Sequence, residues 1–354
     1  MNRFLKYFFV LIGCLVVIEL ILRLFSLCST TITDVTKNKL LYIPGSKNIE
    51  LRELYAQRKA NKLGFFDREY DTSLINRKRW FFFGNSFTAA VQVANELTFE
   101  NQLEDSLNKN LDDSLYEIWN LGKSGATFLD EIYFYDKIFR NIKVKGCIFQ
   151  ISSGSLEETS FASTYNTKIN GEKINSDLDD LDKMTAFRKI QFFLTSKSVL
   201  FNLLNSKLFT FKRYLMSIKS NFKNKKSISR MDIEPDEYFT NAVHNEKISE
   251  NSIAHLNSYL DYLKKHRVDT AVKIGILCFP PPSHYQDSIY RALCVKANIS
   301  YLNSSSLNYQ FTYKKLELFG ALNLKLGSGH LSVLGNHILA KELFKSVKQS
   351  QLIN

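Results

Sequence analysis

Five short, mostly apolar runs have the length and flanking residues of buried strands. They cover residues 80–83, 116–119, 146–151, 272–278 and 299–302. Between them, apolar residues recur at helical spacing, which predicts helices that begin at Thr98 and span about 127–140 and 333–347. Strands that alternate with helices predict a parallel sheet with helices on both faces. The pattern therefore indicates an α/β fold.

The N-terminal region contains a continuous apolar run, Phe8–Phe25. At about 1.5 Å per residue, such a helix crosses most of a ~30 Å hydrocarbon core. Glu19 and Arg23 interrupt the run four residues apart, so they share a helix face and can pair. A cleaved signal peptide is the alternative, but residues 26–30 make a poor cleavage site. We expect residues 1–29 to form a retained, single-pass membrane anchor.

The flanking charges predict the orientation of this anchor. Arg3 and Lys6 precede the apolar run, and the positive-inside rule then keeps the N-terminus in the cytoplasm. The remainder of the chain is expected outside the cytoplasmic membrane. Residues 30–78 are polar and mixed, which predicts a linker that packs on the domain, and residues 79–350 form the expected α/β domain.

An insertion of about 156–250 interrupts the alternation of strands and helices. Asn170-Gly171 predicts a hairpin turn, and residues 184–218 have a helical pattern. Eight basic residues and no acid occupy 207–230. This segment could lie on an anionic membrane surface or be a solvated face of a cap over the site.

Composition and charge exclude some classes of function. Lys and Arg exceed Asp and Glu by 47 to 35, a net charge of +12, yet no nucleic-acid-binding motif accompanies them, so we expect no nucleic-acid partner. The five cysteines form no CxxC pair, so no metal site is expected, and nothing in the sequence points to a cofactor. Cys147 and Cys278 fall inside strands as buried thiols, and Cys294 alone could find a disulfide partner.

Small residues cluster where three of the expected strands end, at 84–86, 122–125 and 152–155. In a parallel sheet these loops converge on one crevice at the carboxyl edge. Ser86 follows a strand and a glycine, and such a turn exposes the hydroxyl beside free backbone N–H groups. His330 stands in a Gly/Ser-rich loop before the last helix and could act as its general base.

Five motifs occur in order over residues 55–345: Asn61-Lys62-Leu63-Gly64-Phe65-Phe66, Phe83-Gly84-Asn85-Ser86-Phe87-Thr88, Asn120-Leu121-Gly122-Lys123-Ser124-Gly125, Ser153-Gly154-Ser155-Leu156 and His330-Leu331-Ser332-x-x-Gly335. In order and spacing they resemble the membrane-anchored branch of the SGNH/GDSL hydrolases. That family's blocks read Asn-x-x-Gly-Phe-Arg, Gly-Asp-Ser-Phe-Thr, Asn-x-Gly-x-x-Gly, Gly-Asn-Asp and Asp-x-x-His.

The resemblance implies a flavodoxin-like three-layer α/β/α sandwich, the SGNH hydrolase fold. It also implies Ser86 as nucleophile, His330 as base, and an oxyanion hole from the backbone N–H groups of Ser86 and Gly125. Asn85 and Gly122 would support the site. The typical chemistry is hydrolysis or transfer of an acyl ester, often an acetyl group on a surface carbohydrate.

Three positions depart from the family pattern. Asn85 replaces the aspartate of Gly-Asp-Ser, a change that the nucleophile tolerates. Gly154 or Ser155 stands where an asparagine donates the third oxyanion hydrogen bond, and the Ser155 hydroxyl could replace it. Ser328 stands near the place of the triad aspartate.

The missing triad carboxylate leaves several groups that could orient His330. They are Ser328, a backbone carbonyl, or a remote acid such as Asp130 or Glu157. Two hypotheses follow. The chain is an extracytoplasmic esterase or O-acyltransferase that acts on acylated carbohydrate through a Ser86–His330 dyad, or it is a catalytically silent relative that binds glycan or serves as a scaffold in a cell-envelope pathway.

Overall fold

The computed structural model describes most of the N-terminal apolar helix and of the α/β domain. The described residues are 3–25, 41–50, 56–71, 73, 76–110, 115–152, 168–169, 172–173, 186, 190, 194, 198–201, 203–204, 250–265, 271–313, 315–320 and 329–353. The basic segment 207–230 lies outside them.

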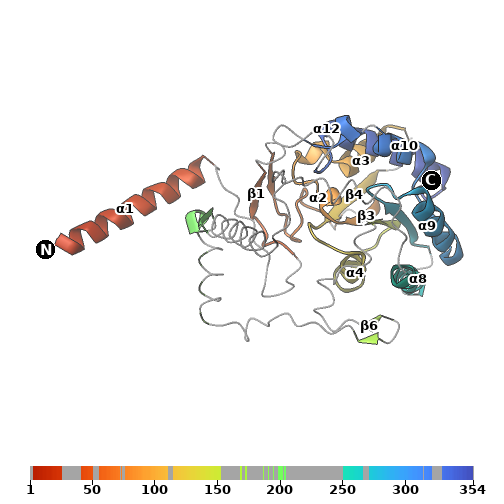
Figure 1. The fold of residues 1–354 in the computed structure, drawn as a ribbon, viewed down its shortest axis with the longest axis horizontal. Coiled ribbons are helices and arrows are strands. Elements are labelled where there is room, and N and C mark those ends of the chain that lie inside the picture. The colour runs from red at the N-terminus through yellow and green to blue at the C-terminus, as the bar shows by residue number, and fades with distance from the viewer. Residues whose placement is uncertain are drawn as a thin grey trace, which may run out of the picture.

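Five parallel strands form the central sheet, in the order β4-β3-β5-β8-β9. Their bounds are β3 Lys78–Gly84, β4 Tyr116–Gly122, β5 Gly146–Ile151, β8 Lys273–Cys278 and β9 Ser300–Tyr301. Counted within the sheet, this order is 2-1-3-4-5, the order of doubly wound flavodoxin-like folds. The predicted parallel α/β fold is confirmed, and its strands lie where the apolar runs indicated (Figure 1).

Helices cover both faces of this sheet and make three layers (Figure 1). Along β3, Trp80 and Phe82 pack on one face and Phe81 and Phe83 on the other, because successive strand residues point in opposite directions. The first face is covered by α3 Phe99–Asn110, α10 Ser305–Tyr313 and α12 Val333–Gln349. The second is covered by α4 Phe128–Tyr133, α8 Glu250–Lys265 and α9 His284–Ala297.

Local sequence signals set where several of these helices begin. Thr98 precedes α3 and its hydroxyl accepts the N–H of Asn101, as predicted for an N-cap. Thr127 and Asp130 form a capping box at α4, which continues as a π-helical turn over Phe134–Phe139. The expected helix over 127–140 is therefore present in two parts.

The segment expected to be a linker contains a β-hairpin that the sequence did not predict. Strands β1 Lys47–Glu50 and β2 Ala56–Lys59 pair antiparallel, and a small cluster of Tyr42, Ala60 and Phe66 packs beside them. The strands are polar and only half-buried in alternation, so no apolar run announces them. Short elements complete the domain: η1 Asn95–Leu97 and α11 Lys315–Leu318.

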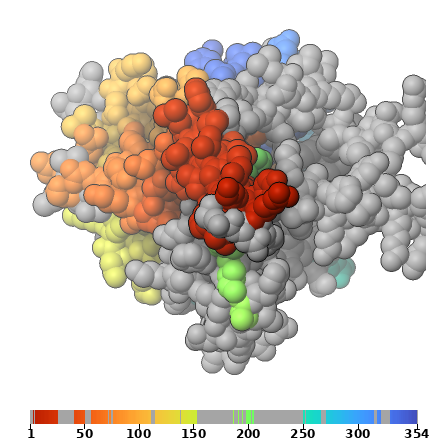
Figure 2. Space-filling model, turned by 90° about the vertical axis from the view of Figure 1, so that its left-hand side faces the viewer, coloured from red at the N-terminus to blue at the C-terminus, as the bar shows by residue number. Residues whose placement is uncertain are grey.

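Helix α1, Arg3–Leu24, extends away from the domain (Figure 1). Its Leu5–Leu24 part has a mean hydropathy of 2.5, is not buried, and is long enough to cross a membrane. The expected Glu19–Arg23 ion pair is present, with Arg23 Nε 2.7 Å from Glu19 Oε1. Glu19 also accepts the N–H groups of Val199 and Leu200, which ties part of the insertion to α1. In Figure 2 the red residues of α1 lie toward the viewer, in front of the domain.

Two smaller expectations can also be compared with the structure. Strands β6 Lys168–Ile169 and β7 Glu172–Lys173 pair antiparallel, which confirms the hairpin around Asn170-Gly171. Cys147, Cys278 and Cys294 are all buried as free thiols, so Cys294 forms no disulfide.

Glu131 on α4 is a buried acid. The residue is 1% exposed, and among the described residues neither carboxyl oxygen has a hydrogen-bond partner. Burial raises the pKa of Glu131 well above its ordinary value, with the nearby Asp130 contributing in the same direction. Burial therefore favours the protonated form of Glu131 in the folded protein, whereas the unfolded chain ionises this side chain with the ordinary pKa of about 4.3.

We predict that Glu131→Gln raises the melting temperature at pH 8 and changes it little at pH 4.5. The raised folded-state pKa costs stability only above the unfolded pKa, and an amide removes that cost. A gain of 1 kcal/mol corresponds to about 2–4 °C for domains of 150–250 residues. Thermal unfolding at the two pH values, with the exposed Glu317→Gln as control, measures the effect. Equal shifts at both pH values would contradict the assignment.

Candidate active site

Ser86 lies at the turn between β3 and the short helix α2, Ser86–Ala89. Asn85 caps this helix, since its side-chain oxygen accepts the N–H of Phe87 at 3.0 Å. Ser86 is half-buried, and among the described residues its hydroxyl has no hydrogen-bond partner. Its backbone N–H, at the first helical position, has no acceptor within the helix. The turn therefore presents a hydroxyl and an N–H donor together.

Helix α2 lies unusually close to β3 and β4. A Cβ on Gly122 would come within 3.0 Å of the backbone of Thr88 and Ala89, and a Cβ on Gly84 would meet the Thr88 side chain. Asn120 fastens the same helix, because its Nδ2 donates to Thr88 O at 2.7 Å while its Oδ1 accepts the Gly122 N–H. Glycine at 84 and 122 thus permits the contact that fixes the turn.

Gln150, at the end of β5, fixes the turn from the other side. Its Oε1 accepts the backbone N–H of Asn85 and the hydroxyl of Thr88, each at 3.2 Å. Its Nε2 donates to Phe279 O at 2.6 Å, just after β8. One buried amide therefore links three neighbouring strand ends to the residue before Ser86.

The loop after β4 lies directly beside Ser86. Gly84 and Gly122 are register partners, and Lys123 N–H donates to Gly84 O at 2.9 Å. Gly125 has φ +79°, a conformation that favours glycine, and it is exposed at the tip of this loop. Gly154 and Ser155, expected in the third loop, lie outside the described residues, although β5 ends at Ile151 on the same edge.

His330 lies on the same side of the molecule as Ser86. Its ring centroid is 5.2 Å from that of Phe87, the residue that follows Ser86. The loop is held by an antiparallel bridge between Phe319 and Leu331, and Gln92 Nε2 donates to Leu331 O at 3.0 Å. The structure therefore places the His330 ring against the residue that follows Ser86, although the two lie far apart in the sequence.

Asp130 is not positioned to orient His330. Its Oδ2 accepts the N–H and the hydroxyl of Thr127 in the α4 capping box. Helix α4 packs on the face of the sheet opposite to the one that contains Phe87 and Leu331. Ser328 and Glu157, the other side chains considered for this role, lie outside the described residues.

Sequence reasoning missed three residues that hold the site: Gln150, Gln92 and Asp67. Asp67 Oδ2 accepts the N–H of Asn120 at 3.0 Å, so it anchors the residue that fastens α2. A glutamine inside an otherwise apolar strand was a signal for Gln150. Gln92 and Asp67 lie in irregular segments, where no pattern marks them. Within the described ranges, no three His, Cys, Asp or Glu residues are grouped to hold a metal ion.

Comparisons with known proteins give similarity of shape only. No family model and no curated protein matches the chain. Among solved structures it is similar to TesA, with 10% identity and a TM-score of 0.40 over 77% of this chain and 99% of TesA. It is also similar to a lipase/acylhydrolase from Enterococcus faecalis, with 11% identity and a TM-score of 0.39 over 77% of this chain and 96% of that one.

A third similar structure is the acetylxylan esterase Axe2 from Geobacillus stearothermophilus. Its identity is 12% and its TM-score 0.38, over 76% of this chain and 94% of that one. Similarity of this degree does not assign chemistry, so the function proposed below rests on the geometry of the site.

We predict that Gly122→Ala destabilises the domain by about 1–3 kcal/mol, because the new methyl group must displace the α2 backbone. Chemical denaturation of the full chain in detergent measures the change. Gly13→Ala is the matched control, since nothing lies within 4 Å of the added Cβ there. A Gly122→Ala protein as stable as the Gly13→Ala protein would show that α2 does not need the close approach.

Proposed function

We propose that this chain is a membrane-anchored serine esterase or O-acyltransferase of the SGNH type, acting on acylated cell-surface carbohydrate. One observation carries the proposal. Ser86 begins helix α2, and its hydroxyl has no hydrogen-bond partner among the described residues. The next residue of this helix, Phe87, contacts the His330 ring. A nucleophile, a base and free N–H donors then share one edge of the sheet.

The residues support a two-step acyl transfer. Ser86 Oγ attacks the ester carbonyl carbon while its proton passes to a ring nitrogen of His330. The oxyanion accepts hydrogen bonds from the N–H groups of Ser86 and Gly125, and the Ser155 hydroxyl serves as the third donor. His330 then protonates the leaving alcohol as the C–O bond breaks. An acyl-serine remains.

The second step decides between hydrolysis and transfer. His330 removes a proton from water or from an acceptor hydroxyl, the new oxygen attacks the acyl-serine carbonyl, and Ser86 leaves with its proton restored. Water gives a free acid, and a sugar hydroxyl gives a transferred ester. Both outcomes use the same residues, so the acceptor rather than the dyad separates an esterase from a transferase.

Hydrolysis of p-nitrophenyl acetate by the full-length protein in detergent tests the dyad. Ser86→Ala and His330→Ala are each expected to lower kcat/KM by at least about a hundredfold. The double variant should lose little more, because the two residues act as a unit. Ser288→Ala, which removes an exposed hydroxyl on α9, should leave the rate unchanged.

The alternative is a catalytically silent relative that binds glycan or acts as a scaffold. The replaced family asparagine and aspartate favour it, since each loss weakens transition-state stabilisation. A well-folded wild-type protein that hydrolyses no ester above the Ser86→Ala background would establish that alternative.

The apolar α1 supports placement in the cell membrane with the domain outside the cytoplasm. We predict that Ser288→Cys, exposed on α9, reacts with a membrane-impermeant maleimide in intact cells. The described native cysteines of the domain are buried, so the parent protein gives the background. Labelling of Ser288→Cys only after lysis would place the domain in the cytoplasm.

A further inference from the structure

A groove of about 510 Å³ lies between α1 and the insertion, and its lining is mostly apolar. The lining includes Ile12, Leu15, Glu19 and Arg23 from α1, and Ser198 and Leu204 from the insertion. The α1 residues recur every three or four positions, so they share one face of the helix. Part of the insertion therefore follows α1 along that face.

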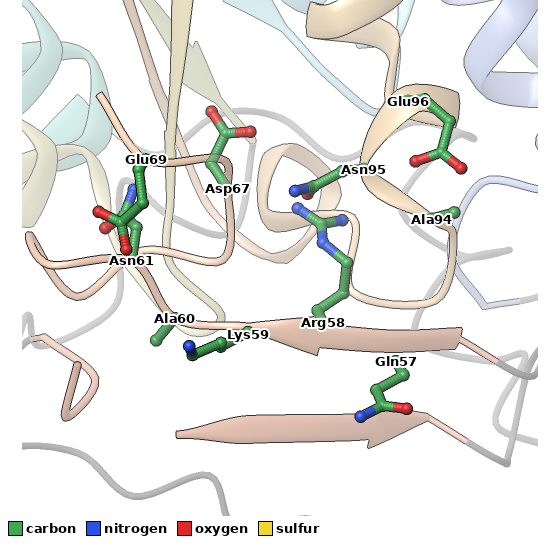
Figure 3. A pocket seen from close by; sticks show the side chains of 10 residues that line it. All are labelled: Gln57, Arg58, Lys59, Ala60, Asn61, Asp67, Glu69, Ala94, Asn95 and Glu96. Atoms are coloured by element: carbon green, nitrogen blue, oxygen red, sulfur yellow. The ribbon is translucent and has the colours of Figure 1, made fainter. Parts of the chain in front are cut away.

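A polar cleft of about 480 Å³ between β2 and the loop that follows α2 differs in kind (Figure 3). Arg58 in its lining donates to the backbone oxygens of Ala90, Val93 and Phe66. This guanidinium thus stabilises the fold of the domain itself, whereas the groove beside α1 is bordered by exposed apolar side chains.

Glu19 on α1 holds the start of a helical turn in the insertion. Its carboxylate accepts the backbone N–H of Val199 at 3.0 Å, that of Leu200 at 2.8 Å and the Ser198 hydroxyl at 3.0 Å. Ser198 Oγ in turn accepts the N–H of Phe201 at 3.0 Å. The N–H groups of residues 199–201 are therefore all bonded, although the start of a helix supplies no acceptor for them.

These hydrogen bonds satisfy groups that hydrocarbon would penalise on both sides of the contact. A carboxylate inside a membrane span is costly unless it is paired, and so is a backbone N–H without an acceptor. Glu19 is paired with Arg23 at 2.6 Å and with the N–H groups of the insertion. The contact therefore suits an environment that excludes water.

The position of Glu19 along α1 gives the depth of this contact. Glu19 precedes Leu24, the end of the apolar stretch, by about 7.5 Å at a rise of about 1.5 Å per residue. Ile12, at the other end of the groove, lies about 18 Å from Leu24. In a hydrocarbon core of ~30 Å spanned by Leu5–Leu24, the groove extends from near the outer boundary to about the middle.

Apolar side chains of the insertion are exposed around this contact. Ile190 is 58% exposed, Leu194 37% and Leu204 50%, much as Leu15 on α1 is 43% exposed. Water penalises such a surface, whereas lipid acyl chains do not. The sequence then continues into the basic stretch 207–230, whose charge suits anionic headgroups.

We infer that the described insertion residues between Ile190 and Leu204 form a second membrane contact, embedded among lipid acyl chains beside α1 in the outer half of the bilayer. The inference goes beyond the proposed function and rests on the proposed membrane placement of α1. It gives Glu19, the acid inside the apolar span, the role of holding the insertion at that depth. The domain is then attached to the membrane at two points of the chain.

Quenching by brominated lipid tests this contact in the full chain. The protein is reconstituted in vesicles of phosphatidylcholine with a minor share of phosphatidylglycerol, and the phosphatidylcholine is either plain or brominated on one acyl chain. We expect Ile190→Trp and Leu204→Trp each to lose at least about twofold more emission to bromine than the parent protein, because an indole among acyl chains meets the quencher. The parent's Trp80 and Trp119 are buried in the domain and give the background.

Two further variants separate this inference from the proposed anchor. Leu20→Trp, exposed on α1, reports whether α1 lies in the bilayer, and Tyr309→Trp, exposed on α10, should show background quenching only. Strong quenching of Leu20→Trp with background quenching of Ile190→Trp or Leu204→Trp would overturn the inference alone. Background quenching of Leu20→Trp as well would refute the anchor and the inference with it. Equal quenching of Tyr309→Trp and Leu204→Trp would overturn the inference too, since the contact would not be specific to the insertion.

The role of Glu19 is tested in the Leu204→Trp protein. Adding Glu19→Ala should lower the bromine quenching at least about twofold, because the N–H groups of Val199 and Leu200 lose their acceptor at membrane depth. Adding Glu19→Gln, which keeps an acceptor oxygen, should preserve more of it. Quenching unchanged by Glu19→Ala would contradict the role given to this side chain.

Discussion

The close packing of α2 against the carboxyl ends of β3 and β4 is the constraint on which the site depends. Only glycine fits at 84 and 122, because a Cβ at 122 would meet the Thr88–Ala89 backbone and a Cβ at 84 would meet the Thr88 side chain. Asn120 on β4 and Gln150 on β5 then hold the turn and the helix by hydrogen bonds. Without this contact, Ser86 would have no fixed direction, and the donors around it would not converge. The packing of α2 on the sheet thus fixes the position of the Ser86 side chain.

The residues that follow α2 are also held by hydrogen bonds to distant parts of the chain. Beyond Ala89 the chain is fastened by Arg58 from the β1–β2 hairpin, and Gln92 reaches the loop that carries His330. The hairpin is therefore part of the framework around the Ser86 turn rather than a spacer between α1 and the domain. The proposed nucleophile and the loop that carries the proposed base both depend on the short segment from Ser86 to Gln92.

The sheet and the turn could be predicted because their signals are local. Apolar runs marked β3, β5 and β8, and clusters of small residues marked where β3, β4 and β5 end. The β1–β2 hairpin could not be predicted, because polar strands such as Ala56–Lys59 carry no apolar pattern. Gln92, Asp67 and Arg58 act through partners distant in sequence, so only tertiary structure reveals their roles. The pairing of Ser86 with His330 stays a prediction from motif order, and the residues that hold the turn were not predicted.

The central claim is that Ser86 is an activated nucleophile served by His330. Peptide mapping by mass spectrometry after reaction of the full-length protein with a fluorophosphonate tests it most directly. The account predicts an adduct on Ser86 that forms far more slowly in His330→Ala. An unmodified Ser86 in well-folded protein, or an adduct that forms equally fast without the imidazole, would contradict it.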